Sequence, residues 1–79
     1  VELDNTPLVF PNPTKNGFFI NTEQHSLVQI FNVLGGEVLS TITQNNKTSI
    51  NCSDWSKGFY FINLTDPFGN TKNTSIIIK

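Results

Sequence analysis

The sequence contains no arginine and no methionine, and it has one histidine and one cysteine among its 79 residues. Five lysines stand against six acidic residues, so the formal net charge is only −1 at pH 7. This balance argues against nucleic-acid binding, because phosphate neutralisation and bidentate guanine recognition both depend on basic side chains. The single cysteine rules out a disulfide within the sequence.

Long apolar runs are also missing. No stretch approaches the ~18 apolar residues of a membrane span, and no secretory signal opens the chain. The first residue is Val1 rather than methionine, so we expect a fragment of a longer protein, with any signal peptide upstream. A chain of 79 residues makes one domain at most, and its thin core leaves little room for a deep active site.

The side-chain combinations that catalysis or metal binding requires are absent from the sequence. We interpret His25 as an exposed turn residue, because nothing local supports a nucleophilic dyad with Cys52. Asp54 and Asp66 lie in turn-forming segments, where aspartate bonds the backbone two residues on, so we interpret them as turn residues rather than calcium ligands. The sequence therefore predicts a domain that is not an enzyme and has no catalytic residues, no metal site and no cofactor.

The sequence does contain short β-branched and aromatic runs, separated by clusters of Gly, Pro, Asn and Asp. Their spacing of roughly 8–12 residues is typical of an all-β sandwich. We predict a seven-stranded antiparallel β-sandwich of the immunoglobulin or fibronectin kind, preceded by a linker at Val1–Pro7. The predicted strands are Leu8–Phe10, Phe18–Asn21, Leu27–Val33, Val38–Thr43, Thr48–Asn51, Phe59–Thr65 and Thr71–Ile78.

The dipeptide Gly35-Gly36 predicts a tight hairpin between the third and fourth strands. In that hairpin Val33 would lie opposite Val38, and Phe31 opposite Ser40. Both faces are then partly apolar, so alternation alone does not decide which face points inward.

We expect Val28 and Ile30 to point into the core, with Val38 and Ile42 joining them across a β-bulge near the turn. The segment Phe59–Thr65 is apolar on most of both faces, which predicts a central position in its sheet.

On that central strand we expect Tyr60, Ile62 and Leu64 to face the core. The five residues 66–70 predict a longer hairpin loop to the last strand. Trp55, Tyr60 and Phe68 could instead form a sugar-stacking platform, although we favour core positions for Trp55 and Tyr60. A small adhesive or carbohydrate-binding module is therefore the alternative reading.

Two segments call for a specific explanation. Near the start, Pro11 and Pro13 each fix a backbone φ angle and push Phe10 and Asn12 toward extended geometry. At the end, three consecutive isoleucines at positions 76–78 form an aggregation-prone strand unless it is paired within the sheet. That strand is either an ordinary final strand of the sheet or a strand that a partner protein must recognise.

Four motifs follow one another along the sequence. In order, they are Val9-Phe10-Pro11-Asn12-Pro13-Thr14 with Gly17, then Val28-Gln29-Ile30-Phe31-Asn32-Val33-Leu34-Gly35, then Gly58-Phe59-Tyr60-Phe61-Ile62, and finally a terminal Ile-Ile-Lys. Their order and spacing strongly resemble the type A C-terminal sorting domain of the type IX (Por) secretion system of Bacteroidota. The resemblance covers about residues 8–79. It implies a non-catalytic secretion signal fused to a larger N-terminal passenger, which Val1–Pro7 would link to the domain.

The resemblance also implies partners and a destination. The folded sandwich would be presented to the outer-membrane type IX translocon, and a sortase-like surface protease would remove it at or before the segment 1–8. The passenger would reach the cell surface or the medium. The signature positions implied are Pro11, Asn12, Pro13, Gly17, Gly35, Gly58, Tyr60, Ile76, Ile78 and Lys79. Of these, only the terminal strand and Lys79 are expected to be surface candidates for direct recognition.

Overall fold

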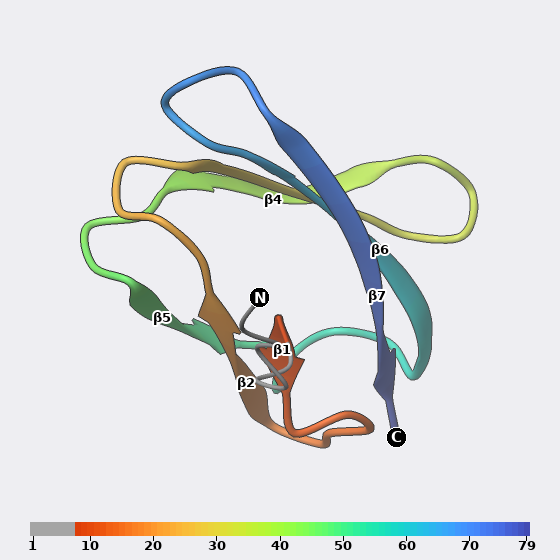
Figure 1. Ribbon diagram of the computed structural model, residues 1–79. Helices are drawn as coiled ribbons and strands as arrows, with labels where there is room; N and C mark the ends of the chain where they lie inside the picture. The colour runs from red at the N-terminus through yellow and green to blue at the C-terminus, as the bar shows by residue number, and fades with distance from the viewer. Residues whose placement is uncertain (1–7) are drawn as a thin grey trace, which may run out of the picture.

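The computed structural model describes residues 8–79, which form seven β-strands and no helix (Figure 1). The all-β prediction is confirmed, and each predicted strand is present with ends shifted by at most two residues. The predicted linker at Val1–Pro7 lies outside the described residues. The strands are β1 (Val9–Phe10), β2 (Gly17–Asn21), β3 (Leu27–Phe31), β4 (Glu37–Ile42), β5 (Lys47–Asn51), β6 (Gly58–Thr65) and β7 (Thr71–Ile78).

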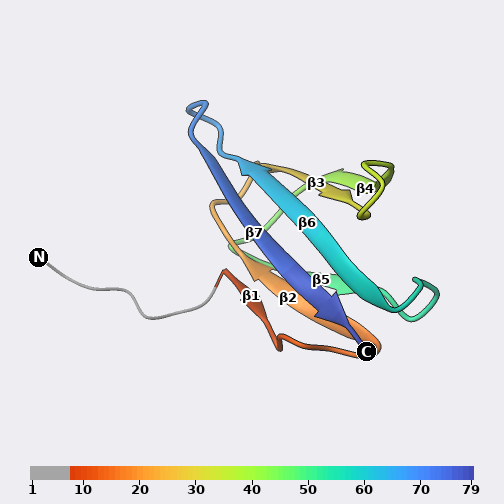
Figure 2. The ribbon, with the colours of Figure 1, turned by 90° about the vertical axis from the view of Figure 1, so that its right-hand side faces the viewer.

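The strands form two sheets, one of three strands in the order β1-β2-β5 and one of four in the order β4-β3-β6-β7. Every pair of neighbouring strands is antiparallel. The two sheets face each other as the layers of a sandwich (Figure 2). This is the arrangement of immunoglobulin-like sandwiches, in which two antiparallel sheets pack face to face over one core. Strand β6 lies between β3 and β7, as its two-sided apolar character predicts.

The core lies between the sheets and takes alternate residues from most strands. On β6, Tyr60, Ile62 and Leu64 are buried, so the predicted inward face is confirmed. Because these residues alternate with Phe59 and Phe61, both phenylalanines lie on the outer face. The buried core consists of Val9, Phe18, Ile20, Val28, Ile30, Ile50, Cys52, Tyr60, Ile62, Leu64, Ile76 and Ile78.

The inward face of β4 differs from the prediction. Val28 and Ile30 are fully buried as expected, but Val38 is 39% exposed and Ile42 is 48% exposed. A register shift between Ile30 and Phe31 confirms the expected irregularity, but the residue opposite Ile30 is Leu39. Since opposed residues share a face, the inward side of β4 is the Leu39 side, and Val38 and Ile42 point outward.

The hairpin between β3 and β4 explains this difference. The predicted pairing of Val33 with Val38 is wrong, because β3 ends at Phe31, which pairs with Glu37. The Asn32 side-chain oxygen accepts hydrogen bonds from the N–H groups of Leu34 and Gly36, at 3.0 and 2.9 Å. With this asparagine turn, β3 ends at Phe31, whereas a two-residue glycine turn would let the pairing continue at least to Val33.

The loop between β6 and β7 has the same design. Asp66 accepts hydrogen bonds from the N–H groups of Phe68 and Asn70, both at 2.9 Å. Hydrogen bonding, chiefly from the backbone N–H of Asn70, lowers the pKa of the Asp66 carboxyl. The interpretation of Asp66 as a turn residue and the prediction of this hairpin loop are therefore confirmed.

Candidate recognition site at the terminal strand

Strand β7 is anchored on its inner face by two isoleucines. Ile76 and Ile78 are buried in the core, while Ile77 between them is half-buried on the outer face. Lys79, directly after the strand, is exposed. Of the isoleucine tail, only Ile77 and the lysine thus offer side chains at the surface, so the buried Ile76 and Ile78 side chains serve packing.

The outer edge of β7 is covered by the segment that contains the two prolines. The Asn12 side-chain amide donates a hydrogen bond to the carbonyl of Ser75 at 3.3 Å, and its oxygen accepts one from the N–H of Ile77 at 3.1 Å. One carboxamide therefore supplies both a donor and an acceptor to successive outward-facing groups of the strand, as a neighbouring peptide group would.

Thr14 continues this pairing with its backbone. Its N–H donates to the carbonyl of Ile77 at 2.9 Å, and its carbonyl accepts from the N–H of Lys79 at 2.7 Å. Thr14 itself is buried, and its hydroxyl donates to the carbonyl of Gly17. The result is a short parallel bridge between Thr14 and Ile78.

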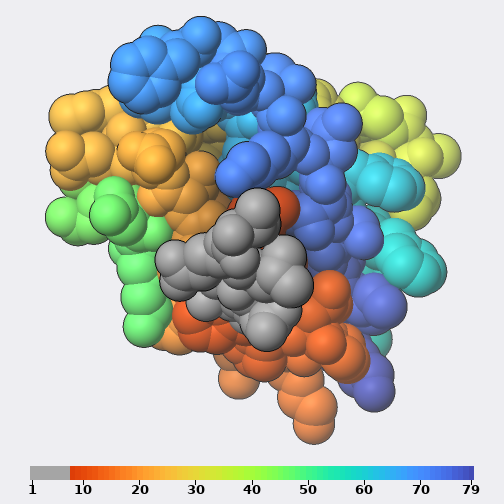
Figure 3. All heavy atoms as spheres, in the orientation of Figure 1, coloured from red at the N-terminus to blue at the C-terminus, as the bar shows by residue number. Residues whose placement is uncertain are grey.

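We call Asn12 and Thr14, with the contacts they make to β7, the edge clamp. It pairs the outward backbone groups from the Ser75 carbonyl to the Lys79 N–H. In the space-filling view the orange start of the described chain lies beside its dark-blue end (Figure 3). Unpaired strand edges are templates for association with other chains, and the clamp removes that hazard from the isoleucine-rich half of β7.

The two prolines flank Asn12 at the surface. The Phe10-Pro11 and Asn12-Pro13 peptide bonds are both cis, and both prolines are exposed. Together with Asn12, they form the loop that connects β1 to Thr14. The sequence singled out both the proline segment and the isoleucine tail, but gave no sign that they touch.

Tyr60 occupies the corner where the chain enters β6. Its hydroxyl donates a hydrogen bond to the carbonyl of Ser56 at 2.6 Å, four residues upstream. A tyrosine bonded in this way at the start of the corresponding strand is the tyrosine corner of immunoglobulin-like sandwiches. Gly58, between them, has a φ of +139°, which a residue with a side chain rarely adopts. These two signature positions therefore have a structural explanation.

The remaining signature glycines are also explained by local geometry. Gly17 lies against β5, where a Cβ atom would stand 2.9 Å from the carbonyl oxygen of Ile50. Gly35 has a φ of +88° in the β3–β4 loop and lies apart from the clamp. The structure thus brings together Asn12, Ile76, Ile78 and Lys79, and adds Thr14, which the sequence analysis did not select.

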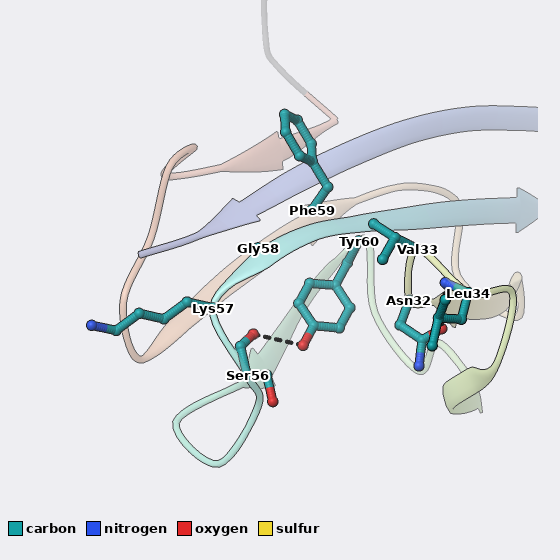
Figure 4. Close-up of a pocket in the computed structure, with 8 residues that line it drawn as sticks. All are labelled: Asn32, Val33, Leu34, Ser56, Lys57, Gly58, Phe59 and Tyr60. Atoms are coloured by element: carbon teal, nitrogen blue, oxygen red, sulfur yellow. Dashed lines mark hydrogen bonds between the residues drawn. The ribbon is translucent and has the colours of Figure 1, made fainter.

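A shallow pocket lies near the tyrosine corner. It has a volume of about 230 Å³ and is lined by the residues at positions 32–34 and 56–60 (Figure 4). Figure 4 shows Phe59 and Tyr60 on opposite sides of β6, and Lys57 extending away from the pocket. The lining includes Ser56 and Lys57, but no hydrogen bond joins their side chains, so the pocket lacks the paired nucleophile and base that acyl transfer would require.

The candidate catalytic pair does not come together. The N–H of His25 bonds to the carbonyl of Thr43, beyond one end of β2, whereas the N–H of Cys52 bonds to the carbonyl of Asn16 at the other end. Burial raises the pKa of the Cys52 thiol, which disfavours the thiolate nucleophile. Among residues 8–79, no group of three or more His, Cys, Asp and Glu side chains could hold a metal ion.

The candidate sugar platform is not assembled either. Trp55 packs partly buried against the core, with its ring centroid 6.1 Å from that of Phe18 and 5.1 Å from that of Tyr60. Phe68 is 82% exposed, but it lies beyond the opposite end of β6. The expectation that Tyr60 belongs to the core is confirmed, and Trp55 packs against the core from its edge.

No helix in the described part of the chain is long and apolar enough to cross a membrane. The fold and the clamp together define a small immunoglobulin-like sandwich module with a secured final strand. The chain belongs to the family of secretion system C-terminal sorting domains, whose pattern matches residues 8–79. This confirms the resemblance to type IX sorting domains, and with it a sorting role that is not catalytic and a secreted or cell-surface location.

Two larger proteins contain a similar segment. The chain is 34% identical over 74 residues to an endo-acting ulvan lyase of Formosa agariphila, covering 90% of this chain. It is 36% identical over 74 residues to the ulvan lyase NLR42 of Nonlabens ulvanivorans, again covering 90% of this chain. In both cases the match spans only 14% of the relative's own length.

Proposed function

We propose that this domain directs a larger N-terminal passenger through the outer-membrane type IX translocon, and that a sortase-like surface protease then removes it. The observation that carries the proposal is the family match over residues 8–79, which covers the described domain from β1 to the end of β7. The edge clamp supports it, because a terminal strand held in one shape loses little entropy when a partner binds.

The terminal segment is the part we propose the translocon reads. Lys79 and Ile77 offer side chains at the surface, whereas Ile76 and Ile78 hold the strand in the core. Recognition of the Ile76 and Ile78 side chains would require the strand to leave the core. We therefore assign them an anchoring role, and Ile77 and Lys79 the contact role.

For the passenger, we propose a secreted polysaccharide-degrading enzyme. The support is that both relatives are named as lyases acting on ulvan, and that the match covers only 14% of each. The passenger's coding sequence upstream of Val1 tests this directly.

The sorting role is tested by fusing residues 1–79 to the C-terminus of a reporter that carries a signal peptide, in a Bacteroidota host with the type IX system. We expect the reporter at the surface or in the medium, and a reporter without the domain in the periplasm. Deleting residues 76–79 should retain the reporter in the periplasm. Circular dichroism of the shortened domain separates loss of the signal from loss of the fold.

A further inference from the structure

The outer face of the four-stranded sheet is divided into an aromatic half and a polar half. In the aromatic half, the register places Phe61 between Phe31 and Ser75, and Phe59 opposite Ile77. Phe59 is 52% exposed and Phe61 is 51% exposed. We call Phe31, Phe59, Phe61 and Ile77 the aromatic patch. It is continuous with the terminal strand, because Ile77 is one of its members.

The polar half begins one pair further along the same strands. There Gln29 lies opposite Asn63, and Asn63 opposite Asn73. In the next row Thr65 and Thr71 lie on β6 and β7, and Leu27 and Ile42 continue the row on β3 and β4. The row of Gln29, Asn63 and Asn73 therefore separates the phenylalanines from the other apolar side chains of this face, so they form a patch of their own.

Three of the five lysines gather at the aromatic end of the sheet. Lys15 follows Thr14, whose carbonyl accepts the N–H of Lys79, so these two lysines belong to adjacent segments. Lys57 precedes Gly58, and Gly58 pairs with Ile78. Lys57 therefore belongs to the segment on the side of Lys79 opposite to Lys15. All three are exposed, and none forms an ion pair with another described residue.

Among residues 8–79, acidic side chains near this surface are few and lie at its margins. Glu37 lies opposite Phe31 on β4, where its carboxylate accepts a hydrogen bond from Gln29 at 3.4 Å. Asp54 lies in the turn before Lys57. The end of the sheet at β7 is therefore basic, which favours a partner surface with acidic groups beside an apolar centre.

The size of the patch favours a transient complex with a partner over a stable dimer. Two half-exposed phenylalanines offer on the order of 200 Å² of apolar side-chain surface, and the whole patch a few hundred. A stable interface buries about 800 Å² on each side. A second copy would also bring the lysines of both copies into one interface.

We infer that the aromatic patch and its three flanking lysines form the surface by which this domain docks onto an acidic and apolar protein surface of the outer-membrane translocon. The inference rests on the proposed sorting function and names the contact that performs it. The contact reaches beyond the isoleucine tail, since Lys15, Lys57 and the three phenylalanines come from other parts of the sequence.

The test uses the reporter fusion in the competent host, with quantification of surface and periplasmic reporter. The double variant Phe59→Thr/Phe61→Thr should lower delivery at least about tenfold, since losing one aromatic hot spot alone weakens binding by more than that factor. Its control is Phe68→Thr, which removes a phenylalanine that is 82% exposed beyond the other end of β6 and should leave delivery unchanged.

The lysines are tested with two double variants that each remove two positive charges, so that only the position of the lysines differs. Lys15→Gln/Lys57→Gln should lower delivery severalfold, whereas Lys47→Gln/Lys72→Gln, at other places on the fold, should not. Urea unfolding of each purified variant shows whether it remains folded. If the phenylalanine double variant does not fold, Phe61→Thr alone and the lysine pair carry the test.

The outcomes separate the docking surface from the sorting function. If the unaltered fusion stays in the periplasm, the sorting function fails and the docking surface with it. If the unaltered fusion is exported and both test variants match it, only the docking surface is overturned. A dimer in sedimentation that both test variants abolish would assign the patch to a second copy. Binding to phosphatidylcholine–phosphatidylglycerol vesicles, lost in the same variants, would assign it to lipid.

Discussion

The side chain of Asn12 accepts the N–H of Ile77 at 3.1 Å, across 65 residues of sequence. The same amide donates to the carbonyl of Ser75 at 3.3 Å, so a single side chain stands where a neighbouring strand would otherwise pair. The proline segment and the isoleucine tail are thereby parts of one structure. A sorting domain with an unpaired isoleucine-rich edge would be prone to association before export.

The first prediction concerns this amide. Asn12→Ala removes both hydrogen bonds and should lower the free energy of unfolding by about 1–2 kcal/mol. Urea denaturation followed by Trp55 fluorescence measures the change. Asn16→Ala is the matched control, because Asn16 is exposed in the same segment and its side chain makes no hydrogen bond with another described residue. Equal stability of the two variants would show that the Asn12 amide contributes nothing to holding β7.

Much of this fold could be predicted from the sequence, because the strands are short and the breakers between them are strong. β-Branched and aromatic runs bounded by Gly, Pro, Asn and Asp define all seven strands within two residues. The central position of β6 follows from its two apolar faces. These properties are local, so a single sequence is enough to show them.

The register of β4 and the edge clamp could not be predicted for two different reasons. In the β3–β4 hairpin, Gly35-Gly36 suggested a two-residue turn, but the Asn32 side chain bonds two backbone N–H groups and closes the loop earlier. The clamp joins Asn12 to residues 63 and 65 positions away, and no periodic pattern reports such a contact.

The second prediction concerns the tyrosine corner. Tyr60→Phe removes only the hydroxyl that donates to the carbonyl of Ser56 at 2.6 Å. Because a net hydrogen bond contributes about 1 kcal/mol, the melting temperature should fall by roughly 4–8 °C for a domain of this size. An unchanged Trp55 emission maximum would show that the aromatic packing survives. A melting temperature equal to wild type would show that the corner bond is dispensable.

The third prediction uses the two loops of identical design, one held by Asn32 and one by Asp66. Hydrogen bonding lowers the pKa of Asp66 in the folded state, so its contribution to stability is full above the ordinary value of about 3.9. The contribution is lost as the pH falls through the folded pKa. Asp66→Asn gives this loop the chemistry of the Asn32 loop, and should remove that part of the acid sensitivity.

Urea unfolding at neutral pH and at about pH 2.5 measures this difference. Any advantage of wild type over Asp66→Asn at neutral pH should shrink on acidification. Asp54→Asn is the control for the loss of one carboxylate, since the Asp54 side chain makes no hydrogen bond with another described residue. A difference between wild type and Asp66→Asn that stays constant with pH would contradict the assigned role of the carboxylate.

Amide hydrogen exchange along β7 tests most directly whether the edge clamp protects the outer edge of the terminal strand. The N–H groups of Ile77 and Lys79 are held by the clamp, whereas the outward-facing N–H of Asn73 makes no hydrogen bond among the described residues. In the unaltered domain, Ile77 and Lys79 should exchange slowly and Asn73 rapidly. In Asn12→Ala, Ile77 should lose protection while Ile76, paired with Tyr60 inside the sheet, keeps it. Exchange of Ile77 as fast as Asn73 in the unaltered domain, or unchanged by the substitution, would contradict the clamp.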